Sequence, residues 1–216
     1  MPSSRPARDR AADTRERLLA AALRVFNRDG VAGASIHAIC AEAGVSIGST
    51  YHHFGSKQGL ADALQAAGLR AHLESLRGRL PDPPSARASV TVLVDALIDW
   101  VQANPEWARF IYFEAAGRAR GAAVQAVNSD YAAVVGEHFR PLIAAGALRR
   151  LPADSYASLV LGPTHDFARR ALAGQTAADL DGRRALLREA AWRAVSSPSP
   201  AASTPIMATF GSSRNG

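Results

Sequence analysis

Two short helix-forming segments joined by a glycine restrict the fold of this chain more than any other feature. The segment SIHAICAEAGVSIGSTYHHF begins at Ser35, whose hydroxyl can cap a helix. Gly44 follows that helix at the position where a left-handed turn costs glycine least. Ser46 can cap a second short helix that runs through His53. A helix, a tight turn and a second helix with a small, polar surface predict a helix-turn-helix over residues 35–54.

Helical patterning extends over the rest of the chain. Apolar residues recur every three or four positions from about Asp13 to Gly30, and again from a serine cap at Ser56 to about Arg79. No segment alternates apolar and polar residues for long enough to predict a strand. We therefore predict an all-α fold of about nine helices. The helices expected after the proline-rich segment PDPPSA span Val90 to the residue before Asn104, 106–115, about 120–145, 153–173 and 178–195.

Composition divides the chain into four parts. Residues 1–11 are polar and basic and predict a flexible arm, which either stays in solvent or enters a minor groove. Residues 12–72 contain the helix-turn-helix in an N-terminal domain, and residues 73–195 form a second helical domain beyond it. Residues 196–216 include SSPSPAASTP and hold too few apolar residues to fold, so we expect a disordered tail.

Cysteine count, hydropathy and charge narrow the class of protein. The single cysteine, Cys40, excludes an internal disulfide and suits a reducing compartment, and its place on an apolar face predicts a small buried side chain. No apolar run approaches the ~20 residues that a membrane span needs, and the N-terminus is charged where a signal peptide is apolar. We expect a cytoplasmic protein without a membrane partner. A net charge of +6 favours a polyanionic partner without identifying it.

The second helix of the helix-turn-helix and its flanks carry side chains suited to duplex DNA. Gly48 and Ser49 are small, so the backbone can approach closely, while Tyr51 and His52 can reach phosphates or base edges. The backbone N–H groups at each helix start favour phosphate. Lys57, the only lysine, adds a positive charge beside them. The predicted DNA-contacting residues are Ser35, Ser46, Ile47, Gly48, Ser49, Thr50, Tyr51, His52 and Lys57.

The segment GASIHAICAEAGVSIGSTYHHFGSKQGLADAL resembles the DNA-binding domain of TetR-family transcriptional regulators. The resemblance lies in the capped first helix, the Ala-Gly-Val turn, the spacing of Gly48, Tyr51 and Phe54, and the Ser-Lys pair that opens the next helix. It covers about residues 12–72. Thr50 departs from the pattern, because many members carry an aliphatic residue there. Its side chain either loosens the packing of the helix or buries its methyl group with the hydroxyl bonded to backbone.

The resemblance implies a mechanism and an assembly. A TetR-like chain is expected to be a homodimeric repressor that leaves a palindromic operator when a small effector binds, although a minority of the family activate. It implies that the last two main helices, 153–173 and 178–195, pair with their copies in a four-helix bundle. It implies double-stranded DNA and a small molecule as partners, and no cofactor. An effector-independent architectural DNA-binding dimer is the alternative function.

Aromatic residues gather in the second domain and suggest where an effector binds. Trp107, Phe110 and Glu114 share one helical face by spacing, and Tyr131 and His138 lie on the apolar stripe of the next expected helix. Such stripes are more often plain core, and Glu114 is as well explained by an ion pair with an arginine. The hypothesis is a mostly apolar pocket for a hydrophobic or aromatic effector. Its predicted lining is Trp100, Trp107, Phe110, Glu114, Tyr131, His138 and His165.

The sequence offers little evidence for a catalytic site or a metal site. His52 and His53 are neighbours on a helix, where adjacent side chains point apart, so we expect no metal site. Ser158, His165 and Asp166 are the only residues that suggest a catalytic set. They fall on one expected helix with no oxyanion-hole glycine loop and no nucleophile elbow. We therefore predict that the chain is not an enzyme.

Overall fold

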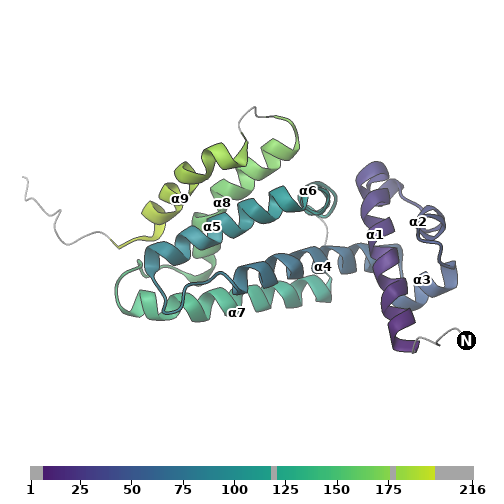
Figure 1. The fold of residues 1–216 in the computed structure, drawn as a ribbon, viewed down its shortest axis with the longest axis horizontal. Coiled ribbons are helices and arrows are strands. Elements are labelled where there is room, and N and C mark those ends of the chain that lie inside the picture. Colours follow the sequence, from purple (N-terminus) through teal and green to yellow (C-terminus); the bar gives the residue numbers. More distant parts are fainter. Residues whose placement is uncertain (1–6, 118–120, 176–178, 198–216) are drawn as a thin grey trace, which may run out of the picture.

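The computed structural model of the chain describes residues 7–117, 121–175 and 179–197, and these residues form nine α-helices and one π-helix (Figure 1). The all-α prediction is confirmed, and the helices follow one another in the expected order. A single isolated bridge between Leu148 and Ser196 is the one β-type pairing in the described ranges. The helices are α1 (Ala7–Gly33), α2 (Ile36–Ala43), α3 (Ile47–Phe54), α4 (Lys57–Arg77), α5 (Ala86–Ala103), α6 (Pro105–Arg109), the π-helix η1 (Phe110–Glu114), α7 (Ala122–Ala144), α8 (Ala153–Leu172) and α9 (Leu180–Val195).

The first helix differs from its prediction at both ends. It begins at Ala7, so residues 7–11, which were expected in the flexible arm, are helical. Alanine and arginine there are good helix formers, but the segment is polar on every side and shows no apolar periodicity. At the other end Gly30 adopts φ 72° and ψ 157°, and helical structure resumes as far as Gly33. Residues 1–6 and 198–216, which hold the rest of the predicted arm and most of the predicted tail, lie outside the described residues.

Helices α1 to α4 pack around one apolar core. Leu18, Phe26, Ile39 and Leu60 are fully buried in it, and Phe110 from η1 reaches the same core. A segment of the second domain thus helps to close the first. Helices α2 and α3 lie at the end of the molecule farthest from α9 (Figure 1).

Helix α4 connects the two parts of the molecule. It packs against α1 near its start and against α5 and α7 further along, and it runs unbroken across the predicted domain boundary at residue 72 (Figure 1). The second part has its own core, in which α5 packs against α8 and α9. Helix α4 therefore contributes side chains to both cores.

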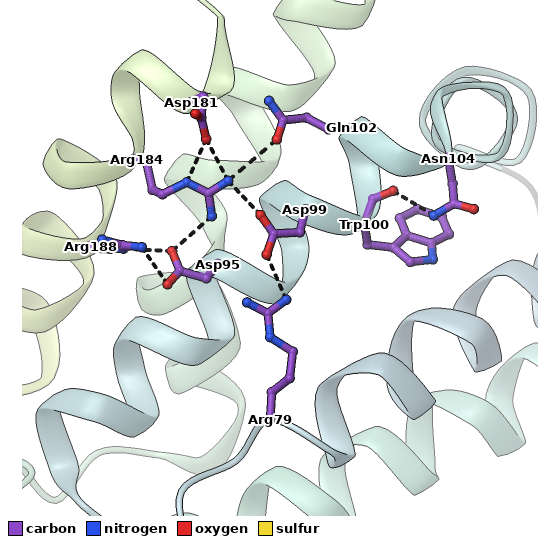
Figure 2. Close-up of polar contacts among 9 residues, drawn as sticks. All are labelled: Arg79, Asp95, Asp99, Trp100, Gln102, Asn104, Asp181, Arg184 and Arg188. Atoms are coloured by element: carbon purple, nitrogen blue, oxygen red, sulfur yellow. Dashed lines mark hydrogen bonds and ion pairs between the residues drawn. The ribbon is translucent and has the colours of Figure 1, made fainter.

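An ion-pair network ties the end of α4 to α5 and α9 (Figure 2). Asp95 on α5 accepts two hydrogen bonds of 2.7 Å from Arg188 on α9. Asp99, one turn further along α5, lies 2.6 Å from Arg184 of α9 and 2.8 Å from Arg79, just beyond α4. Asp99 thus links Arg79, which follows α4, to Arg184 of α9, and this holds the end of α4 near α5 and α9.

This network should make the fold sensitive to acid. Burial tends to raise the pKa of Asp99, but hydrogen bonds from Arg184 and Arg79 outweigh it, so the pKa is lowered. A carboxyl group with a lowered folded-state pKa stabilises the fold above its unfolded pKa of about 4, and that contribution is lost as the pH falls further. We expect urea denaturation to show a fall in stability from pH 5 to pH 3. Asp99→Asn should be less stable at pH 7 and should lose less on acidification; an unchanged pH profile in this variant would contradict the assignment.

Candidate nucleic-acid interface and ligand cavity

Side-chain caps fix the helix-turn-helix as the sequence predicted. Ser35 Oγ accepts a hydrogen bond of 3.1 Å from the backbone N–H of Ala38. Gly44 adopts a left-handed conformation with φ 63° and ψ 41°. The guanidinium of Arg17 donates to the carbonyl oxygens of Ala43 and Gly44, at 2.5 and 3.0 Å. The turn is therefore held by its own glycine and by α1 behind it.

Helix α3 presents a solvent-facing surface. Ser46 Oγ caps it by accepting from the N–H of Ser49 at 3.2 Å. Tyr51 is 49% exposed and Ile47 36%, and a side-chain carbon added at Gly48 would meet nothing within 4 Å. His52 is also exposed. We call Ile47, Gly48, Tyr51 and His52 the outer face of α3; Gly48 leaves the backbone open to a close partner.

Thr50 does not belong to this outer face, and its predicted DNA contact is wrong. The side chain is 1% exposed. Its hydroxyl donates to the carbonyl of Ser46 at 3.3 Å and lies 3.0 Å from Sγ of Cys40 on α2. The second interpretation of Thr50, a buried methyl with the hydroxyl bonded to backbone, is confirmed. Cys40 is buried as expected.

Lys57 has a structural contact that sequence reasoning missed. Its ammonium donates to the carbonyl oxygens of Ala32 and Ala34, each at 2.8 Å. These bonds tie the start of α4 to the end of α1. An ammonium group carries three protons, so one stays available for the predicted phosphate contact.

Two residues predicted to line the ligand pocket lie instead at the junction of the two cores. Phe110 is fully buried and stacks on Phe26 of α1 with ring centroids 5.9 Å apart. Glu114 Oε2 accepts a hydrogen bond of 3.1 Å from the backbone N–H of Val31, just after the break in α1 at Gly30. Both side chains hold η1 against α1, and neither lines the two cavities described below.

Three further predicted pocket residues line neither of the two cavities described below. Trp107 packs against both cores close to Gly68 of α4. Trp100 is 8% exposed, with its ring 5.6 Å from that of His72. His138 Nε2 is hydrogen bonded to the hydroxyl of Ser89 at 2.8 Å. These residues are packing and hydrogen-bonding partners in this structure, and their ligand contacts stay predictions.

Two adjoining cavities lie along α7 and α8. The small chamber has a volume of about 410 Å³ and is lined by the predicted residues Tyr131 and His165, together with His72 of α4, which was not predicted. The large chamber has a volume of about 870 Å³. Four residues line both chambers: Asn128, Tyr131, Ala157 and Leu161. A sequence signal for His72 did exist, because it interrupts the apolar stripe of α4, as a ligand-facing polar residue would.

The two histidines of the small chamber both have lowered pKa values, which favours their neutral forms. Burial lowers the pKa of His72 to about 4, and partial desolvation also lowers that of His165, although part of the latter ring is exposed. The Tyr112 hydroxyl is 2.6 Å from Nδ1 of His165. Burial raises the pKa of both Tyr112 and Tyr131.

The helix-turn-helix region is similar to known bacterial regulators. The family model described as "Bacterial regulatory proteins, tetR family" matches residues 18–64. The HTH-type transcriptional regulator UidR of Escherichia coli K12 is 44% identical over 54 residues, which cover 25% of this chain and 28% of that protein. The UidR protein of Shigella flexneri matches to the same extent. This chain thus covers little more than a quarter of the length of these curated relatives.

Solved structures extend the similarity to the whole fold. A TetR family transcription regulator from Marinobacter aquaeolei VT8 has a TM-score of 0.75 at 20% identity, covering 88% of this chain and 100% of that one. FadR from Bacillus subtilis, solved in complex with stearoyl-CoA, has a TM-score of 0.71 at 14% identity, covering 82% of this chain and 96% of that one. At these identities the likeness concerns the fold. Together the matches show that residues 18–64 are similar to the helix-turn-helix DNA-binding domain of the TetR family, and that the chain has the fold of TetR family transcription regulators.

Within residues 7–117, 121–175 and 179–197, no helix is long and apolar enough to cross a bilayer. In those same segments no three His, Cys, Asp or Glu side chains are grouped so as to hold a metal ion.

Proposed function

We propose that this chain is a homodimeric transcriptional repressor that a small effector releases from a palindromic operator. The observation that carries the proposal is the outer face of α3, which follows a capped turn and is open to solvent at Gly48 and Tyr51. Such a second helix enters the major groove and reads base edges there.

Dimer formation is supported by apolar side chains on α8 and α9. The two helices pack against each other, and each keeps a leucine in solvent: Leu159 is 40% exposed and Leu186 57%. A second copy can cover such side chains. A two-fold dimer then presents its two copies of α3 to half-sites about 34–36 Å apart. The dimer interface proposed here is formed by α8 and α9.

Leu186→Glu should convert the dimer to a monomer, because it places a charge where two apolar surfaces meet. The monomer should then bind the operator at least about 100-fold more weakly, since only one half-site is engaged at a time. Light scattering after size-exclusion chromatography gives the mass. Phe113→Glu is the matched control, because Phe113 is similarly exposed, at 41%, but lies on η1. A dimeric Leu186→Glu variant would place the interface elsewhere.

Helix α4 is the element that can couple the effector cavity to DNA. Lys57 ties its start to α1, His72 lines the small chamber, and Arg79 ties its far end to α5. Midway, a side-chain carbon at Gly68 would lie only 2.7 Å from Cε3 of Trp107, so α4 and α6 are in close contact there. An effector that shifts α4 changes the distance between the two copies of α3 in the dimer, which favours dissociation from the operator. Couplings of this kind are typically ~1–3 kcal/mol.

Selection from random-sequence duplexes tests the proposed function. The full chain is incubated with the pool, bound DNA is recovered over several rounds, and the product is sequenced. The proposal predicts enrichment of one sequence with two-fold symmetry. Recovery of unrelated sequences would favour the architectural DNA-binding dimer, and no retention of duplex would contradict DNA binding altogether.

A further inference from the structure

His72 is a buried polar residue with an unmet hydrogen-bonding requirement. The residue is 8% exposed and lines the small chamber, and its buried Nδ1 atom has no hydrogen-bond partner among the described residues. Its ring stacks on that of Tyr131, with centroids 6.0 Å apart. A buried polar atom without a protein partner destabilises a fold, and a ligand in the chamber can supply the missing hydrogen bond.

The chemistry of the small chamber selects an uncharged polar group. Among the described residues, its polar lining consists of Asn128, Tyr131, Ser158 and the two histidines His72 and His165, with no acidic side chain, lysine or arginine. Imidazole, phenol, hydroxyl and amide groups both donate and accept hydrogen bonds. A hydroxyl or carbonyl group fits such a lining, whereas a carboxylate would enter a partly buried chamber without a counter-ion.

The large chamber accommodates an apolar group beside it. Its apolar lining comes from α5, α7, α8 and the segment before α8, and includes Leu93, Val135, Phe139, Ile143, Leu151 and Val160. The charged residues on its lining, Arg140, Arg150 and Asp154, are all exposed to solvent. Since four residues line both chambers, one elongated molecule can occupy the two together.

We propose that the effector is an uncharged amphiphile, with a hydroxyl or carbonyl end hydrogen bonded among His72, Tyr131 and His165 and an apolar chain in the large chamber. This inference rests on the proposed effector response. It adds the chemical class of the ligand and the residues that select it.

Isothermal titration of the full chain with a homologous probe series tests the class of ligand. The probes are 1-octanol, 1-decanol and 1-dodecanol, each paired with the carboxylate of the same chain length. At least one alcohol should bind, and its paired carboxylate should bind at least about tenfold more weakly at pH 7.5. Binding of none of the alcohols, or carboxylate affinity equal to or above that of the alcohols, would overturn the proposal.

His72→Phe separates ligand recognition from packing. Phenylalanine keeps a ring against Tyr131 and removes both ring nitrogens, so affinity for the alcohol should fall about tenfold while the melting temperature without ligand should rise. A structural histidine would give the opposite thermal shift. Tyr131→Phe, which removes only a hydroxyl, should weaken alcohol binding about threefold. The control His138→Phe removes a histidine from α7 outside both chambers and should leave affinity unchanged.

Operator binding measured on the same proteins distinguishes two kinds of failure. If wild-type protein binds the selected operator but alcohol affinity does not depend on His72, the amphiphile inference is wrong and the proposed regulator stands. If wild-type protein binds the alcohol through His72 but no duplex sequence is selected, the regulator proposal is wrong while the ligand class stands.

Discussion

Gly48→Glu should lower operator affinity at least about 100-fold without lowering the stability of the fold. A side chain at this position meets no atom within 4 Å, so glutamate fits without displacing its neighbours. Glutamate is a better helix former than glycine and is favoured in the first turn of a helix, which can even raise stability slightly. On the outer face of α3 it would bring a negative charge against the phosphates, and like-charge contacts in an interface cost several kcal/mol.

Fluorescence anisotropy with a labelled operator duplex measures this loss. Gly78→Glu is the matched control, because Gly78 caps α4 with an ordinary φ of −71° and a side chain there also meets nothing within 4 Å. It adds the same charge far from α3 and should change affinity less than about threefold, an effect of long-range charge alone. Equal effects of the two substitutions would show that net charge, rather than the position of α3, controls DNA binding.

Phe110→Ala should destabilise the protein by about 3–5 kcal/mol. The side chain is fully buried and stacks on Phe26, in the core that η1 shares with α1. Its removal leaves a cavity at the junction of the two parts of the molecule, so the first domain should also loosen from η1. Urea denaturation followed by circular dichroism gives the free energy of unfolding.

The same substitution distinguishes the packing role of Phe110 from a ligand contact. Phe113→Ala changes a 41% exposed ring on the same π-helix and should alter stability by no more than about 0.5 kcal/mol. At a temperature where Phe110→Ala is folded, its affinity for the alcohol probes should match that of wild type. Lost probe affinity with unchanged stability would restore Phe110 to the ligand site.

Local sequence signals predicted the helix-turn-helix well. Ser35, Ser46 and Ser56 each cap a helix, and Gly44 adopts the left-handed conformation that its position required. These features depend on hydrogen bonds between residues three or four positions apart, so they can be predicted from a short stretch of sequence. Thr50 was misplaced because its burial depends on Cys40, ten residues away on another helix.

The effector site was harder to predict, for two physical reasons. The spacing argument for Trp107, Phe110 and Glu114 assumed a regular α-helix, but residues from Phe110 to Glu114 form a π-helix, whose wider turn changes which residues share a face. In addition, a stripe of aromatic residues along a helix is equally compatible with packing in a core and with lining a cavity, so it does not identify a ligand site. His72 came from α4, outside the aromatic region, because the chambers arise only when α4, α7 and α8 are assembled.

Affinity cleavage from α3 tests the central claim that this helix lies in the major groove. Gly48→Cys is labelled with an iron chelate; the protein's only natural cysteine, Cys40, is buried. Hydroxyl radicals should cut the selected operator at two symmetry-related positions, centred about 34–36 Å apart, and the same label at Gly78→Cys should give no cuts. Cleavage spread evenly along the duplex, or none from position 48 while the protein is bound, would contradict the account.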